Sequence, residues 1–468
     1  MNSKFSGLKK LIGPLDFYGS VMAVTIPIMI QNGITSFVGM LDNIMVGRVG
    51  TDAMSGVSII NQLLFVYYLC VFGGLAGIGI FTAQFWGKRD FRGMQYTIRA
   101  KLLLGFFLTA AGFLVLFFGQ DFLIGMFLHE GGSTGNIGQT MHQAKIYLNV
   151  MYFNLLPVAV SNVYSSTLRE TGQTVVPMKA GIAAVVVNLI GNYILIYGKF
   201  GAPVLGVAGA AIATVLSRFV ELFIVIWWTH SHPDKNPYIR GCFRSFRIPL
   251  SLLKNFAAKG TPLLCNEALW SIGQTVLMQC YSVRGLTTVA SLNISNTLAE
   301  LFNIVFISMG NATAILLGQR MGSGRMKGVK ADALRVSAFS VLLSFGTGLG
   351  MFLAAPYFPN FYKTTDEVRT LASGLLRMNA LFMPLFAYTN AAYFTIRSGG
   401  KTLITFLFDC CFCWAVSVPA AFWVSRSTSL SVVWMFMFVQ SFELIKAIIG
   451  FVLVVRGRWI HDLTAYTD

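Results

Sequence analysis

Acidic residues inside long apolar segments are the positions of this sequence most suited to chemistry. The chain is 55% hydrophobic and only 11% charged, and a carboxylate inside such a segment is costly unless it is paired or hydrated. Four of these acids have no basic residue within one helical turn: Asp42, Glu267, Glu300 and Asp409. We therefore expect them to bind a coupling cation, a proton or a cationic substrate.

Two other acids have a base three positions away on the same predicted helix. Glu221 follows Arg218, and Lys446 follows Glu443. Residues at this spacing lie on one helix face and can neutralise each other. We predict that both pairs are structural.

The apolar segments indicate an all-α membrane protein. Mean hydropathy is +0.67, and runs of about 20 apolar residues are long enough to cross a bilayer as helices. The predicted spans number twelve: 17–44, 54–84, 102–128, 147–168, 176–198, 205–228, 260–283, 288–317, 334–358, 376–396, 402–424 and 430–455.

The basic residues predict the orientation of these spans. Most of the 35 Lys and Arg residues fall in the N-terminal segment, the C-terminal segment and alternate loops. By the positive-inside rule both termini are cytoplasmic, in a plasma membrane or bacterial inner membrane. The net charge of +17 is then explained by these cytoplasmic loops, which face membrane lipids, and does not indicate nucleic acid as a partner.

An internal repeat divides the chain into halves. At a spacing of 235, five residues recur: Pro27 and Pro262, Gly50 and Gly285, Asn61 and Asn296, Gln84 and Gln319, Gly87 and Gly322. At a spacing of 228, Arg169, Gly172 and Thr174 recur as Arg397, Gly400 and Thr402. Two six-span halves must have the same orientation, which is a parallel repeat. We predict pseudo-symmetric six-helix lobes over 1–228 and 260–468.

The lobes are joined by a basic, aromatic linker over 229–259. Two interpretations of the linker remain open. It is either a partly amphipathic segment on the anionic inner leaflet or a plain solvated loop.

Four segments resemble the multidrug and toxic compound extrusion (MATE) family: 42–51, 169–174, 206–214 and 318–322. Pro262 followed by Asn266, Glu267 and Trp270 is similar to a bacterial branch of that family. The resemblance covers nearly the whole chain. It implies two lobes in a V around a central cavity, and export of organic cations or drugs driven by inward Na⁺ or H⁺.

The resemblance also implies a cation site in the first lobe. Asp42 and Asn188 match family positions, so Na⁺ binding at these two residues is expected. Thr214 matches a sixth-helix threonine, whereas Asn192 stands where the family has an aspartate.

Glu267 matches a family acid in the second lobe, but the tenth span has no acidic partner for it. We expect Glu267 to act alone or with Asp409, which favours competition between a proton and a cation. Pro27 and Pro262 lie inside spans, where each leaves a carbonyl without its helical partner and permits bending. They are our hinge candidates.

The favoured function is a monomeric secondary antiporter with no cofactor other than its coupling ion. A lipid-linked oligosaccharide flippase of the same superfamily is an alternative, but it would need basic residues in its cavity. A membrane-embedded transferase is another, although no loop has a histidine–acid constellation. We therefore expect a transporter and not an enzyme.

The charge distribution predicts that Thr134 is outside the cell and that Lys327 is inside, as is the linker near Arg244. An impermeant thiol reagent added to intact cells should label a cysteine at position 134 and leave one at position 327 unlabelled. The reverse pattern would contradict the orientation.

Overall fold

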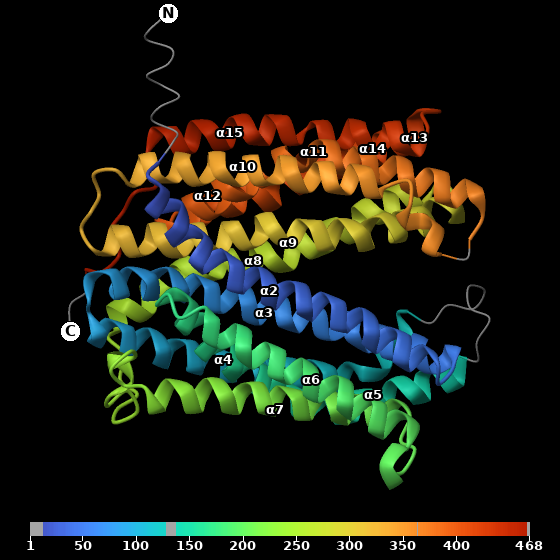
Figure 1. Ribbon diagram of the computed structural model, residues 1–468, viewed down its shortest axis with the longest axis horizontal. Coiled ribbons are helices and arrows are strands. Elements are labelled where there is room, and N and C mark those ends of the chain that lie inside the picture. Colours follow the sequence, from blue (N-terminus) through green and yellow to red (C-terminus); the bar gives the residue numbers. More distant parts are fainter. Residues whose placement is uncertain (1–12, 128–136, 363, 466–468) are drawn as a thin grey trace, which may run out of the picture. The chain divides into compact units, whose positions relative to one another are not determined.

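The computed structural model describes residues 13–127, 137–362 and 364–465, which form helices and no strands (Figure 1). Position 134 lies outside the described residues. The first half consists of α2 (Leu15–Gly47), α3 (Thr51–Lys88), α4 (Phe91–Gly125), α5 (Ile137–Glu170), α6 (Val175–Tyr197) and α7 (Val207–Ser231). The short turns η1 (Lys199–Gly201) and η2 (Pro237–Ile239) precede and follow α7.

The second half begins with α8 (Leu250–Ser282), α9 (Leu286–Gly322), α10 (Val329–Ala354), the turn η3 (Phe358–Phe361) and α11 (Asp366–Ser398). The eleventh predicted span is a run of α12 (Thr402–Phe406), two π-helical segments η4 (Leu407–Cys411) and η5 (Cys413–Ser417), and α13 (Val418–Ser427). The twelfth is α14 (Val432–Ser441) followed by α15 (Glu443–Arg456). Of the described helices, eleven are long and apolar enough to span a membrane. The less apolar α8 occupies the place of the seventh span.

The chain forms two compact units. One contains the residues up to Met29, then Ala83–Arg89 and Thr261–Ala465, and the other contains Ile30–Thr82 and Asp90–Gly260. We call them the second-half unit and the first-half unit, after the half that supplies most of each.

Two helices change unit along their length. The start of α2 packs in the second-half unit, where Phe17 and Val21 contact Met309 and Val336. The start of α8 packs in the first-half unit, where Phe256 meets the ring of Phe81. The changes fall after Met29 and after Gly260, within three residues of Pro27 and Pro262. Both hinge candidates therefore lie where a helix leaves one unit for the other.

The repeated Gln-x-x-Gly pairs make one contact twice. A Cβ atom added to Gly322 would overlap the main-chain carbonyl of Gln84, and one added to Gly87 would overlap that of Gln319. The ends of α3 and α9 therefore approach through their backbones. Only glycine permits this separation, which explains why the glycine of each pair recurs.

The second repeated block forms a helix-ending turn in each half. Gly172 and Gly400 both have positive φ, 85° and 74°, a conformation that glycine adopts without steric cost. Each stops the fourth long helix of its half and lets the chain reverse into the fifth.

The linker is folded against the first-half unit. Tyr238 and Cys242 are fully buried, and Arg99 of α4 donates to the carbonyl oxygens of Cys242 at 2.7 Å and Arg247 at 3.1 Å. Burial raises the pKa of the Cys242 thiol to about 11, so this thiol is unreactive at neutral pH. A plain solvated loop is therefore wrong for the centre of the linker.

The segment after α15 folds against the second-half unit in a related way. Gln84 donates to the carbonyl oxygens of Ser398 and His461 and accepts from the amide of Leu463 at 2.8 Å. Trp459 is buried beside the Gly399 backbone. In each half, the segment after the sixth long helix lies by the turn that follows the fourth, since Tyr238 hydrogen-bonds Thr171 in the first half and Trp459 contacts Gly399 in the second.

We predict that Gly322→Ala destabilises the protein, because its methyl group would force α3 and α9 apart. Overpacking of this kind costs about 1–3 kcal/mol or more. Thermal unfolding of the purified protein in detergent should show a lower midpoint. Gly346→Ala in α10 is the matched control, since a Cβ there would meet nothing within 4 Å. Equal midpoints for the two variants would contradict the close approach.

Candidate functional site

Three helices bring the predicted first-half residues together. Asn188 and Asn192 are four apart on α6 and share a face, while Asp42 comes from α2 and Thr214 from α7. The α6–α7 contact uses small residues, since a Cβ on Gly191 would lie 2.9 Å from that of Ala213. This close packing places Thr214 next to α6.

Hydrogen bonds link all four side chains. The Asn192 amide donates to Asp42 Oδ1 at 2.6 Å and to Asn188 Oδ1 at 3.2 Å. The Asn188 amide lies 3.2 Å from the Thr214 hydroxyl, and in its other orientation it donates to Asp42 Oδ1 at 2.8 Å. The structure therefore brings the four candidate residues together.

The donor set of this cluster fits a hard monovalent cation. It offers carboxylate, amide and hydroxyl oxygens, the ligands that such cations prefer. The Asn192 Oδ1 atom is buried and has no hydrogen-bond partner among the described residues. Rotation of the Asn192 amide would turn its oxygen toward Asp42 in place of its N–H group, and the Asn188 oxygen faces Asp42 when its nitrogen faces Thr214.

A positive charge also lies close to Asp42. The Arg218 guanidinium donates to Glu221 at 2.8 Å, as its spacing predicts, and it acts electrostatically on Asp42 as well. Asp42 therefore has a basic neighbour on another helix, which residue spacing along its own helix cannot reveal.

The second-half unit has its own polar cluster around α8. The Asn266 amide donates to the Tyr393 hydroxyl at 3.3 Å and to Asp409 Oδ2 at 3.2 Å. The adjacent Glu267 has Tyr393 as its hydrogen-bonding neighbour and the charges of Arg397 and Asp409 nearby. α11 thus supplies a tyrosine and an arginine beside Glu267, where the sequence offered no acidic partner.

Asp409 is paired, which corrects the interpretation of it as an acid without a basic partner. The Lys446 ammonium donates to Asp409 Oδ1 at 2.8 Å and lies 3.6 Å from Glu443. The predicted Glu443–Lys446 pair is therefore present, but it shares its lysine. Sequence spacing missed Asp409 because the contact joins η4 to α15.

Glu300 is not joined to either cluster by a hydrogen bond or ion pair. It lies exposed on α9, and it makes no hydrogen bond or ion pair through its side chain with any described residue. Within the described part of the chain, no three His, Cys, Asp or Glu side chains gather as a metal site would require.

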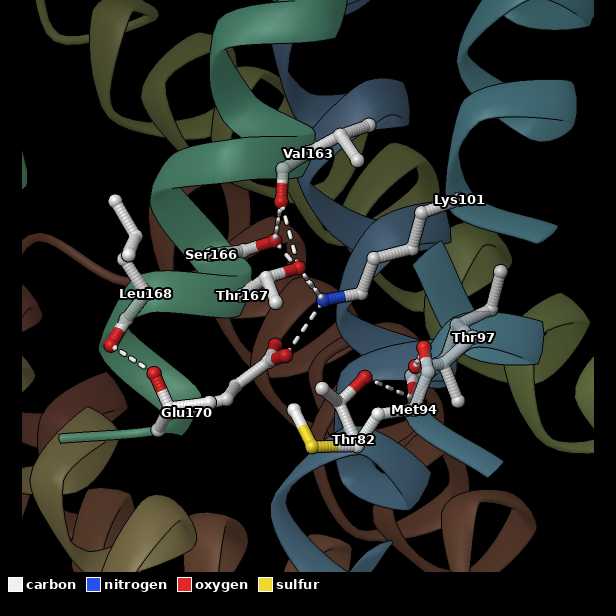
Figure 2. A network of polar contacts seen from close by, with 11 residues as sticks. Thr82, Met94, Thr97, Lys101, Val163, Ser166, Thr167, Leu168 and Glu170 are labelled. Atoms are coloured by element: carbon white, nitrogen blue, oxygen red, sulfur yellow. Dashed lines mark hydrogen bonds and ion pairs between the residues drawn. The ribbon is translucent and has the colours of Figure 1, made fainter. Parts of the chain in front are cut away.

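A buried ion pair on α4 and α5 was missed by the sequence analysis. Lys101 is fully buried, and its ammonium contacts Glu170 at 2.5 Å and the hydroxyls of Ser166 and Thr167 (Figure 2). The predicted third span starts at residue 102 and leaves Lys101 just outside it, whereas in the structure Lys101 lies within α4, nearly three turns after the helix begins. The available signal was Glu170, which sits in the repeated turn motif.

Removal of one member of this pair should strongly destabilise the protein, because the other charge would stay buried alone. We predict that Lys101→Met costs about 3–5 kcal/mol, while Lys101→Met combined with Glu170→Gln recovers most of the loss. Thermal unfolding of the two purified variants tests this. The same midpoint for both would mean that the pair is not coupled.

The comparisons with known proteins agree with this architecture. The MatE family model matches residues 27–194 and again residues 262–423, so the matches begin at the two repeated prolines. A Bacillus subtilis protein described as the probable multidrug resistance protein YoeA is 24% identical over 88% of each chain. The multidrug resistance protein MdtK of Yersinia pestis is 23% identical over 86% of each.

A solved structure described as the outward-facing conformation of a multidrug resistance MATE family transporter has a similar fold. It has a TM-score of 0.84 at 20% identity, and the match covers 97% of this chain and 98% of the other. The family model spans most of this sequence, once in each half. The chain therefore belongs to the MatE family of multi-pass membrane transporters, with twelve transmembrane helices in two pseudo-symmetric halves.

Proposed function

We propose that this protein is a secondary active antiporter that exports drugs and amphipathic organic cations in exchange for Na⁺ or H⁺. Family membership supports ion-coupled transport, and the names of the relatives support multidrug export. One observation carries the proposal for this chain. Each unit holds a carboxyl group, Asp42 or Glu267, among amide and hydroxyl groups within its helices.

The first-half cluster is suited to exchanging a proton for Na⁺. The amide groups beside its carboxylate can either donate a hydrogen bond through nitrogen or bind a cation through oxygen. In the present arrangement the Asn192 amide donates to Asp42. When Na⁺ binds, the amide oxygens and the Thr214 hydroxyl would join the carboxylate as ligands. When a proton binds, Asp42 itself would become a donor to one of these oxygens.

The second-half cluster has a carboxylate beside one positive charge. Glu267 is near Arg397, while Asp409 is taken up by Lys446. Glu267 is therefore the carboxyl group of this unit that is best placed to exchange a proton or a cationic substrate. The cationic character of the cargo rests on these two carboxyl groups.

The two unit-crossing helices supply a means of coupling. The two ends of α2 belong to different units, as do the two ends of α8, and a proline lies beside each change. Bending at Pro27 or Pro262 would therefore move the two ends of a helix, and the units that contain them, relative to each other. Proline suits this role because it leaves one helical hydrogen bond unmade.

The proposed location is the bacterial inner membrane, with both termini cytoplasmic and the protein working as a monomer among membrane lipids. The distribution of basic residues supports this orientation. Three basic side chains within the helices, Lys101, Arg218 and Lys446, pair with the carboxylates of Glu170, Glu221 and Asp409. This pairing disfavours the flippase alternative, in which pyrophosphate would need such groups free.

Reconstituted proteoliposomes test the proposal directly. We predict that a sodium gradient or a pH gradient, imposed separately, drives uptake of a fluorescent organic cation against its own gradient. Asp42→Asn and Glu267→Gln should each reduce this uptake at least about tenfold, because an amide has no negative charge and cannot take up and release a proton. A tenfold change corresponds to about 1.4 kcal/mol.

Asp366→Asn serves as the control, since that carboxylate is 95% exposed and belongs to neither cluster. Full activity in both Asp42→Asn and Glu267→Gln would rule out the two sites. Absence of transport under either gradient would rule out the antiport function.

A further inference from the structure

The last long helix of each half carries a basic residue at the same position of the repeat. Arg218 of α7 and Lys446 of α15 are 228 residues apart, the spacing that also relates Arg169 to Arg397. Each pairs with a glutamate three residues away on its own helix, Arg218 with Glu221 and Lys446 with Glu443. Each also acts on an aspartate from another helix, which is Asp42 or Asp409.

In the second-half unit this cation is bound by direct contacts. The Lys446 ammonium lies 2.8 Å from Asp409 and 3.6 Å from Glu443, and it stands 5.5 Å from the centre of the Phe408 ring. The side chains of Lys446, Glu443 and Asp409 are at most 19% exposed. An ammonium ion between two carboxylates is the arrangement of an occupied monovalent-cation site.

The backbone and a neighbouring amide add to this arrangement. Asp409 lies in the π-helical segment η4, and π-helical turns are frequent at functional sites. Asn266 is 1% exposed and donates to Asp409 Oδ2, but its own Oδ1 atom has no partner among the described residues. A half-turn of the amide would present that oxygen to a cation beside Asp409.

We propose that Asp409, Glu443 and Asn266 form a monovalent-cation site that the protein fills with its own Lys446 ammonium. The tethered ammonium is present at a high effective concentration, so free Na⁺ does not bind there in the native protein. The inference rests on the proposed antiport function in one respect. If Lys446 occupies this site, Glu267 is the carboxyl group of the unit that exchanges the coupling ion. The test of the inference requires no transport.

The site should open to free Na⁺ when the ammonium is removed. Lys446→Met keeps the length and apolar stem of the side chain and leaves two carboxylates without a cation. The unfolding midpoint of this variant, purified as the full chain, should rise by several degrees as NaCl replaces N-methyl-glucamine chloride at constant ionic strength. Binding to the folded state alone produces this rise, which grows with the logarithm of the Na⁺ concentration.

Two further variants separate this site from other sodium effects. Lys446→Arg retains a tethered cation and should respond to Na⁺ as the native protein does. Lys446→Met combined with Asp409→Asn lacks the central carboxylate and should also lose the added response. Any Na⁺ effect from the Asp42 cluster is common to all these proteins and cancels in the comparison.

The inference is overturned if folded Lys446→Met shows no more Na⁺ stabilisation than the native protein, or if the Asp409→Asn combination retains the gain. If Lys446→Met does not fold, Lys446→Met combined with Glu443→Gln removes one of the two unpaired charges. That variant should still gain stability from Na⁺ through Asp409, and an unchanged midpoint would likewise overturn the inference.

Discussion

The structure depends on one constraint, which is that a charge inside an apolar helical bundle must be matched within a few ångströms by an opposite charge or by hydrogen-bonding groups. Lys101 with Glu170, Arg218 with Glu221, and Lys446 with Asp409 all satisfy it. These pairs join helices or adjacent turns and leave their groups unavailable to a substrate. Asp42 and Glu267 have basic neighbours but make no direct ion pair with any described residue, so they are the carboxyl groups best suited to bind an exchangeable cation or proton.

The internal repeat preserves main-chain contacts between the halves more than it preserves their charged side chains. Gly87 and Gly322 permit the same backbone approach, and Gly172 and Gly400 form the same left-handed turn. The charged groups differ between halves at matching positions, with Glu267 in the second half where the first has Asn32. A common scaffold thus carries two unlike polar clusters, which is what an exporter needs if ion and cargo are to be bound by different groups.

The junctions between the units combine bending with anchoring. The prolines of α2 and α8 lie where those helices change unit, and a helix without one internal hydrogen bond bends there more easily. Each half is anchored where its last long helix ends. The Arg99 side chain donates to a main-chain carbonyl of the linker, and the Gln84 side chain donates to one in the C-terminal segment. Motion is therefore expected at the prolines and resisted at these anchored ends.

Residue composition and spacing were enough to predict the membrane class, the repeat and most of the helices, because these features depend on local composition and on position along the chain. They also predicted the pairs Arg218–Glu221 and Glu443–Lys446, which lie three residues apart on a single helix face. The family resemblance placed Asp42, Asn188, Asn192 and Thr214 in one group. The three-dimensional packing of the helices was needed to show that Lys446 pairs with Asp409, that Lys101 is buried against Glu170, and that Tyr393, Arg397 and Asp409 lie around Glu267. Those contacts join helices far apart in the sequence, and their formation depends on the distance and rotation of packed helices, which no single-helix periodicity encodes.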